Sequence, residues 1–343
     1  MKKWLLGLFG LAVSAVAIAL IASKIEWQET VTQIKLAGLR LPLILVVLYM
    51  ATFPIRALRW QCMLPPGTIS FFTALKGVIV GFAGNNFLPT RGGEFLRMEY
   101  LYRKAPHIGR ITAISSVLVE RMLDGLTLLA ILVVALNASH IDITEHSWLR
   151  RLRYVALTVF GLACVGSIVI RVWGGRIAAL LRRTHLAPLH WAATMIERFH
   201  VAAEFLGFNF HTLATVVLGV CVWMVEGALI VIACRHYGLG TQSVVAGYMT
   251  LAIVNFGLLI PSSPGNVGVY QYMTILALAL FGVSHETALA LGIVVHACVY
   301  LPITLTGIVI LIRESVDWRQ RADAAHQVTG PHPRSSENAG AQG

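Results

Sequence analysis

The chain has 343 residues, of which 57% are hydrophobic and 13% charged, and its formal net charge is +11. Soluble globular proteins carry about 25% charged residues, so this composition excludes a water-soluble protein and indicates an integral membrane protein. In a chain this apolar, the positive charge indicates loops beside anionic lipid headgroups rather than nucleic-acid binding.

Six apolar runs are long enough to cross a membrane, since a spanning helix needs about 20 residues. They are Trp4–Ala22, Leu41–Trp60, Ile111–Leu136, Tyr154–Val172, Leu213–Cys234 and Thr287–Ile312. The first run is too long for the apolar region of a signal peptide, and no small-residue cleavage site follows it. We therefore expect it to remain in the protein as a span.

Two further apolar segments are interrupted by helix breakers. Phe71–Met98 contains Asn85-Asn86, Pro89 and Gly92-Gly93, and Val244–Phe281 contains Pro261, Pro264, Gly265 and Gly268. Each segment predicts two half-helices that meet at a turn, in the form of a re-entrant hairpin. Non-helical backbone at membrane depth is tolerated only beside protein or a water-filled cavity, so both breaks predict an interior cavity.

A short motif before each broken segment indicates an internal repeat. Gly67-Thr68-Ile69-Ser70 recurs 173 residues later as Gly240-Thr241-Gln242-Ser243, and a basic residue closes the preceding span in both copies. If the hairpins are re-entrant, the two copies face opposite ways across the membrane. Inverted repeats with broken helices are typical of transporters whose substrate site lies near the midplane.

The predicted fold is an all-α integral membrane protein with about six full transmembrane helices, two re-entrant hairpins and an inverted repeat. The membrane domain covers 1–315, and its repeat halves cover about 41–137 and 213–312. The stretch 176–206 mixes Arg, His, Leu and Phe at helical spacing and predicts an amphipathic interfacial helix. The tail 323–343 consists mainly of small and polar residues, and this composition predicts disorder.

The distribution of basic residues predicts the orientation. The face formed by the N-terminus, the turn at 56–59, the loops 97–110 and 171–198 and the C-terminus, with Arg91 counted there too, carries 18 of the 27 Lys and Arg, and the opposite face carries 7. Lys76 and Arg121 lie within apolar runs. By the positive-inside rule, both termini are expected in the cytoplasm and the protein in the inner (plasma) membrane.

The first break carries the strongest candidate binding site. Its glycines allow close approach to backbone N–H groups that can hold an anion, Arg91 can bind a phosphate bidentately, and Glu94 can orient Arg91. The alternative is an Arg–Glu pair at the interface with glycines that pack helices. The candidate substrate-binding residues are Asn85, Asn86, Pro89, Arg91, Gly92, Gly93, Glu94 and Arg97.

Three charged residues, Glu120, Arg121 and Asp124, lie inside the span at 111–136. Each such charge costs roughly 2.5–3.5 kcal/mol at the bilayer centre, so a charged residue there needs a partner or a function. The three residues either line or gate the substrate path or clamp the two halves together. Glu226, inside the span at 213–234, belongs to the same class.

The second break offers serine and asparagine groups and free backbone amides to headgroup oxygens. Packing alone is the alternative explanation for its glycines. The candidate residues are Pro261, Ser262, Pro264, Gly265, Asn266, Gly268, Tyr270 and Gln271.

Neither metal nor nucleotide chemistry is indicated. The twelve histidines show no HExxH or paired-ligand spacing, and the five cysteines show no CxxC spacing. No GxGxxG, Walker A or GxSxG motif is present. We therefore expect no cofactor, no metal and no catalytic residue, and transport that is either driven by an ion gradient or passive.

At these residues the chain resembles the lysylphosphatidylglycerol synthase transmembrane-region family, also described as flippase-like or UPF0104. The similar motifs are GNNFLPTRGGEFLR (84–97), VERMLDGL (119–126) and PSSPGNVGVYQ (261–271). The resemblance covers nearly the whole membrane part. It implies a membrane domain associated with the flipping of modified lipids, and the family also includes hopanoid-associated proteins and proteins linked to dolichol-phosphate sugar transfer.

Two departures from the family pattern matter. A short polar tail follows Ile312 in place of the cytosolic aminoacyltransferase domain, so we expect that this chain alone does not synthesise an aminoacylated lipid. The second break ends in Gln271, where the family usually has a glutamate.

The preferred hypothesis is a protein that translocates or exports an anionic or amphiphilic lipid, such as a modified phospholipid, a hopanoid or a polyprenyl-linked lipid. In this hypothesis Arg91 holds the headgroup, so Arg91→Ala is expected to abolish activity. One alternative is a glycosyltransferase that uses a polyprenyl phosphate. Another is a non-catalytic partner of a separately encoded lipid-synthesis enzyme.

Overall fold

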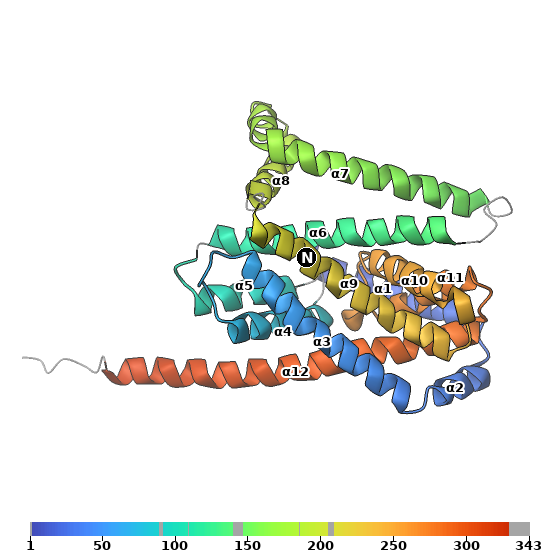
Figure 1. The fold of residues 1–343 in the computed structure, drawn as a ribbon. Helices are drawn as coiled ribbons and strands as arrows, with labels where there is room; N and C mark the ends of the chain where they lie inside the picture. Colours follow the sequence, from blue (N-terminus) through green and yellow to red (C-terminus); the bar gives the residue numbers. More distant parts are fainter. Residues whose placement is uncertain are drawn as a thin grey trace, which may run out of the picture.

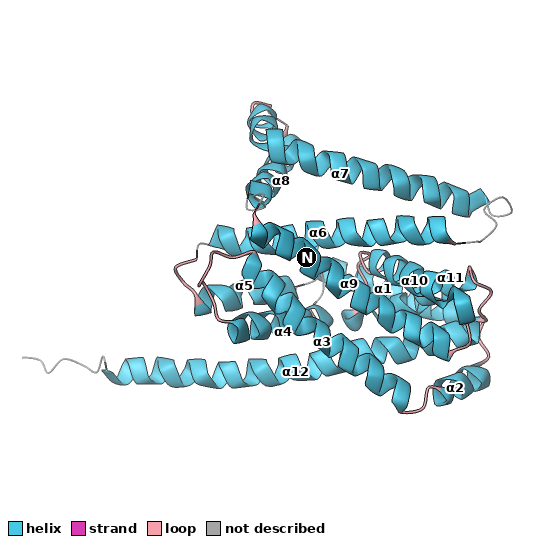
Figure 2. Ribbon diagram, in the orientation of Figure 1, coloured by secondary structure: helices cyan, strands magenta, loops and turns pink. Residues whose placement is uncertain are grey.

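The computed structural model describes residues 2–88, 92–108, 110–139, 147–184, 186–204 and 209–328, and every regular element in these ranges is helical (Figure 1, Figure 2). In chain order the helices are α1 Lys2–Ala22, α2 Trp27–Leu36, α3 Arg40–Cys62, α4 Phe71–Phe87, α5 Gly93–Lys104, α6 Arg110–Ala138, α7 Ser147–Arg182, α8 Ala187–Glu204, α9 Phe210–His236, η2 Gly240–Gln242, α10 Ser243–Gly257, η3 Pro264–Asn266, α11 Val269–Ala279 and α12 His285–Val328. The predicted all-α fold is confirmed.

All six predicted crossings are helices, but fewer qualify as full spans. Within the described residues, four segments are long and apolar enough to cross a membrane: Arg40–Cys62, Tyr154–Arg182, Phe210–His236 and His285–Ser315. A fifth crossing results if Leu8–Ala22 and Trp27–Leu36, which meet at 96°, count as one broken span. The described residues thus contain four or five segments that qualify by length and composition, and the number of about six full crossings, which includes α6 with its three interior charges, stays a prediction.

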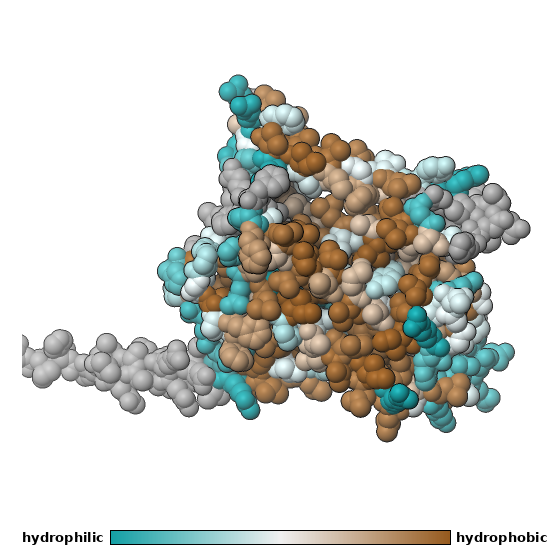
Figure 3. All heavy atoms as spheres, viewed as in Figure 1, coloured by the Kyte–Doolittle hydropathy of each residue, from teal (hydrophilic) through white to brown (hydrophobic). Residues whose placement is uncertain are grey.

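The outer surface agrees with a membrane setting. Figure 3 shows hydrophobic residues over the middle of one face and hydrophilic residues gathered towards its two ends. Large apolar side chains such as Leu43, Leu213 and Leu305 are more than 60% exposed. This is the pattern of a helical protein whose middle contacts lipid tails and whose ends contact headgroups and water.

Both broken segments form two half-helices, as predicted. In the first, α4 and α5 lie against each other at Gly84 and Gly93, where a Cβ on Gly84 would come within 2.7 Å of the Cα of Gly93. In the second, α10 and α11 are joined by the short helix η3, and Gly265 and Gly268 adopt φ angles of 74° and 89°. Such left-handed angles favour glycine, which explains the residue type at both positions.

The helices of the two halves pair in the way an inverted repeat predicts. Helix α4 packs on α12 and α10 packs on α6, while α3 and α9 pack on each other. Helices α3 and α9 run in opposite directions, since Nε of Arg59 near the end of α3 donates to the carbonyl of Thr215 near the start of α9. Figure 1 shows the same opposition for α6 and α12.

Two peripheral segments differ from expectation. The single amphipathic helix predicted over 176–206 is instead the end of α7 and the separate helix α8, because Pro188 favours a new helix start there. The tail predicted to be disordered from Asp323 continues α12 as far as Val328, since no Gly or Pro interrupts the chain before Gly330. Residues 329–343 lie outside the described residues.

Candidate functional site

A cavity of about 780 Å³ lies between the two halves. Its wall contains residues of both broken segments and of helices α3, α6, α9 and α12. The sequence-predicted residues that line it are Asn85, Asn86, Glu94, Arg121, Asp124, Glu226, Pro261, Ser262, Pro264, Gly265, Asn266 and Tyr270. The structure thus brings together, at one cavity, residues that are up to 185 positions apart in the sequence.

Some predicted residues do not line this cavity. These are Gly92, Gly93, Arg97, Glu120, Gly268 and Gln271, which lie behind or beside its wall. Pro89 and Arg91 lie outside the described residues, so the role assigned to Arg91 stays a prediction.

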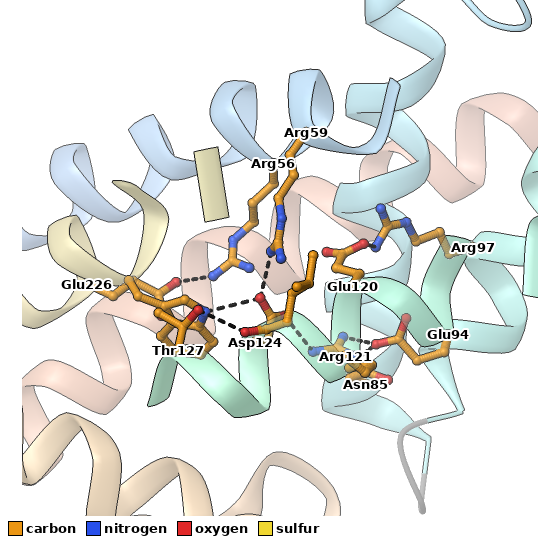
Figure 4. Close-up of polar contacts among 12 residues, drawn as sticks. Arg56, Arg59, Asn85, Glu94, Arg97, Glu120, Arg121, Asp124, Thr127 and Glu226 are labelled. Carbon is orange, nitrogen blue, oxygen red and sulfur yellow. Dashed lines mark hydrogen bonds and ion pairs between the residues drawn. The ribbon is translucent and has the colours of Figure 1, made fainter. Parts of the chain in front are cut away.

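Two arginines of α3 contradict their predicted place in a cytoplasmic turn. Arg56 and Arg59 lie within the helix and are 2% and 1% exposed. Arg56 forms an ion pair with Glu226 of α9, and Nη1 of Arg59 is 2.6 Å from Oδ1 of Asp124 (Figure 4). A carboxylate inside an apolar run requires a cation as its partner. Glu226 and Asp124 could therefore have predicted that two basic residues are buried beside them.

Arg121 is the most exposed charged side chain among the ion pairs of the cavity wall. Its side chain is 28% exposed and forms an ion pair with Glu94 of α5, and Nη1 lies 3.7 Å from Oδ2 of Asp124. Nδ2 of Asn85 also donates to Glu94, at 3.2 Å. Arg121 therefore links the first hairpin to α6 and remains reachable from the cavity (Figure 4).

Arg97 and Glu120 form a second buried pair away from the cavity. Nη1 of Arg97 lies 2.8 Å from Oε2 of Glu120, and both side chains are 1% exposed. The guanidinium of Arg97 also lies 4.0 Å over the Trp60 ring. Arg97 was predicted to lie in a cytoplasmic loop, and its buried position within α5 corrects that prediction, while its predicted role in substrate binding stays a prediction. Of the two roles proposed for Glu120, its position agrees with a clamp between α5 and α6.

The charges in and beside the cavity wall balance. Four arginines (Arg56, Arg59, Arg97 and Arg121) face four carboxylates (Glu94, Glu120, Asp124 and Glu226) in ion pairs that join α3, α5, α6 and α9. Charges in a low-dielectric interior persist only when they are paired and hydrogen-bonded. The described wall consequently offers donors and acceptors to a ligand without a large net charge.

The second break contributes a large part of the described cavity wall. Oγ of Ser262 donates to Oδ1 of Asn266 at 2.7 Å, so these two predicted ligand groups bond to each other. The backbone N–H of Ser263 donates to Oγ of Ser14 at 3.0 Å, which places α1 against this turn. Some polar groups of the second break therefore already have hydrogen-bond partners within the protein. This agrees with the alternative that the second break serves packing.

Sequence reasoning missed further residues of the wall, among them His296 and Tyr300 of α12. The His296 ring stacks on Tyr270 with ring centres 4.3 Å apart, and Tyr300 donates from its hydroxyl to the carbonyl of Asn86 at 3.4 Å. Neither residue belongs to a motif or a break, so their place at the cavity depends on how α12 packs. Among the described residues, no three His, Cys, Asp or Glu side chains gather closely enough to hold a metal ion.

Comparison with known proteins agrees with the motif resemblance. Residues 7–307 match the family model described as lysylphosphatidylglycerol synthase TM region. The chain is 24% identical to glycosyltransferase AglD of Haloferax volcanii over 336 residues, which cover 87% of this chain and 52% of that protein. It is 26% identical to UPF0104 membrane protein PH1989 of Pyrococcus horikoshii over 174 residues, which cover 50% and 48%. The chain therefore spans about half the length of the curated relatives it matches, and no solved structure matches it.

Proposed function

Since the chain belongs to the lysylphosphatidylglycerol synthase transmembrane-region family, we propose that it translocates an amphiphilic lipid across the inner (plasma) membrane. The observation that carries the proposal is the cavity between two oppositely oriented halves, whose wall is made by the tips of both broken helices. Substrate sites of transporters with inverted repeats lie at such a place. The candidate lipids are a modified phospholipid, a hopanoid or a polyprenyl-linked lipid.

The ion pairs of the wall suggest how a headgroup is held. Arg121 is accessible from the cavity, and an anionic headgroup can replace Glu94 as the partner of its guanidinium. Because the Glu94 carboxylate belongs to the first hairpin, this exchange removes one of the two ion pairs that hold the hairpin to α6 and leaves the Arg97–Glu120 pair in place. Binding of the headgroup is thereby linked to movement of the first half, and no bond-making chemistry by the chain is needed. A separately encoded lipid-modifying enzyme would supply the substrate.

A transport assay in proteoliposomes tests this function. Phosphatidylglycerol with a labelled headgroup is reconstituted with the wild-type protein, and an impermeant quencher destroys the label of the outer leaflet. We expect wild type to lose label beyond the half lost by empty liposomes. Arg121→Gln is expected to slow this excess loss at least about tenfold, because a charge-assisted hydrogen bond is worth about 1.5–3 kcal/mol.

Arg182→Gln is the matched control, since Arg182 forms an exposed ion pair with Glu197 away from the cavity, with side chains 49% and 43% exposed. It should transport lipid as wild type does. Wild-type rates in Arg121→Gln would contradict the role of Arg121. The transport function would be contradicted if wild type lost no more label than empty liposomes with each of three labelled lipids: phosphatidylglycerol, a glycosylated polyprenyl phosphate and a hopanoid.

The second candidate function is glycosyl transfer, or partnership with a glycosyltransferase. The relative AglD carries the name glycosyltransferase, and this chain covers 52% of it, so the similarity does not assign that activity to the matched part. The same proteoliposomes separate the two functions. Incubation with a polyprenyl phosphate and a radiolabelled sugar nucleotide should yield no glycosylated lipid if the chain only transports.

We propose further that both termini are cytoplasmic. Arg56, Arg59 and Arg97 are buried and do not count as loop charges, but the remaining 15 basic residues of that face still exceed the 7 of the other. Alkaline phosphatase fused after Ser139 should be active, and the same enzyme fused to the C-terminus should be inactive. A C-terminal green fluorescent protein should fluoresce. The opposite pattern would reverse the orientation.

A further inference from the structure

His296 of α12 is the centre of an aromatic and hydrogen-bonded cluster at the second turn, defined here as residues 258–268. The side chain lines the cavity and is 9% exposed. Its ring lies nearly parallel to that of Tyr270, at an interplanar angle of 6°, and meets Tyr300 edge-on at 5.6 Å between ring centres. Tyr300 in turn reaches the first hairpin through its bond to Asn86, so the cluster touches both broken segments.

The hydrogen bonds of Gln271 determine the protonation state of His296. Oε1 of Gln271 accepts from the backbone N–H of Gly268 at 2.8 Å, so the amide nitrogen faces the imidazole. This nitrogen lies 3.0 Å from Nδ1 of His296. Because an amide nitrogen only donates, Nδ1 must accept and carries no proton. The ring also hydrogen-bonds to the backbone of Gly265, so a neutral imidazole holds both glycines of the second turn.

No other described group of the cavity wall is placed to take up a proton so simply. The carboxylates Glu94, Asp124 and Glu226 are each paired with an arginine. The titratable groups around His296 are Tyr270 of α11, Tyr49 of α3, and Cys298 and Tyr300 of its own helix, and the nearest charges across the cavity are the pair Arg56–Glu226. The tyrosines and the cysteine are neutral acids, which leaves the imidazole as the base.

We propose that His296 is a proton-binding site whose protonation opens the second turn, so that proton binding is coupled to the lipid movement proposed above. A protonated Nδ1 cannot accept from Gln271, and the imidazolium has no carboxylate within the cluster. A buried unpaired charge is strongly unfavourable, so protonation favours a conformation in which the ring is hydrated and the turn has moved away from it. The coupling to lipid movement rests on the proposed transport function, whereas the opening of the second turn on protonation does not.

Hydrogen–deuterium exchange in nanodiscs tests the switch without any transport. The exchange of peptides covering 258–272 is compared at about pH 8, about pH 6 and about pH 4.5, a range that covers the titration of exposed and of buried histidines, after correction for the chemical exchange rate. We expect acidification to increase exchange of the second turn in wild type. His296→Gln keeps a neutral acceptor that cannot be protonated, and should show no such increase.

Gln271→Glu is the gain-of-function variant. A carboxylate at this position can still accept from Gly268 and would pair with the imidazolium. An opposite charge at this distance should move the midpoint of the pH response upward by about one pH unit or more. His211→Gln, which changes an exposed histidine outside the large cavity, is the matched control and should respond as wild type.

Lipid movement measured in parallel over the same pH range separates the two proposals. One coupled proton changes the rate at most about tenfold per pH unit, and this dependence should vanish in His296→Gln. A pH response of the second turn in a protein that moves no lipid would sustain the switch and sink the transport function. A response unchanged in His296→Gln, or a midpoint unmoved in Gln271→Glu, would overturn the switch.

Discussion

Replacement of Glu226 by alanine is expected to lower the free energy of unfolding by about 3–5 kcal/mol, the usual cost of breaking a buried ion pair. Its partner Arg56 is 2% exposed, with its guanidinium 4.6 Å from the centre of the Phe82 ring, and it would keep its charge in an apolar setting. The pair joins α3 to α9, one helix from each half, so its loss weakens the contact between the repeats. Reversible unfolding in mixed micelles measures the change.

Two comparisons make this expectation specific. Glu197→Ala removes the exposed pair with Arg182 and should cost less than about 1 kcal/mol. The double change Arg56→Met with Glu226→Leu removes both buried charges and should destabilise less than Glu226→Ala alone. A double variant as unstable as the sum of its single changes would show that the two residues act independently.

Gly93→Ala is expected to prevent the first hairpin from closing. A Cβ at Gly93 would lie 1.9 Å from the carbonyl oxygen of Gly81 and 2.3 Å from the backbone nitrogen of Asn85. Both are backbone atoms of α4 and cannot move aside as a flexible side chain can, so α4 and α5 must separate. The cost should exceed about 3 kcal/mol, beyond the range of ordinary overpacking. Fluorescence-detected size exclusion should show little folded monomer.

The matched control is Gly161→Ala in α7. No atom lies within 4 Å of a Cβ built there, and the helix should gain up to about 1 kcal/mol because alanine favours helix over glycine. Both variants add one methyl group to a helical glycine, so a difference in folded yield reports the close approach of α4 and α5. Equal yields would contradict the tight contact at Gly93.

The breaks and the apolar runs could be predicted because their causes are local. Runs such as Leu41–Trp60 reflect the thickness of the hydrocarbon layer, and the cluster of Pro and Gly residues in 261–268 interrupts a helix. Membrane depth then requires that the freed backbone groups meet protein or water, which led to the cavity. The motifs around Asn85, Asp124 and Ser262 were found for this reason, and the structure places all three residues in one wall.

The sequence by itself determined the membrane class, the two broken helices and twelve of the residues that line the cavity. Only the tertiary structure decided which charges are buried and which residues meet at the second turn. From the sequence alone, Arg56 is predicted to be a loop cation, and only the fold shows that Glu226, 170 residues later, is its partner. His296 is one of twelve histidines, and only the packing of α12 places it against Tyr270. A charged or polar side chain is buried only when distant helices supply its partners. A hydrophobic pattern predicts where a single helix contacts lipid or water, so it cannot identify those partners.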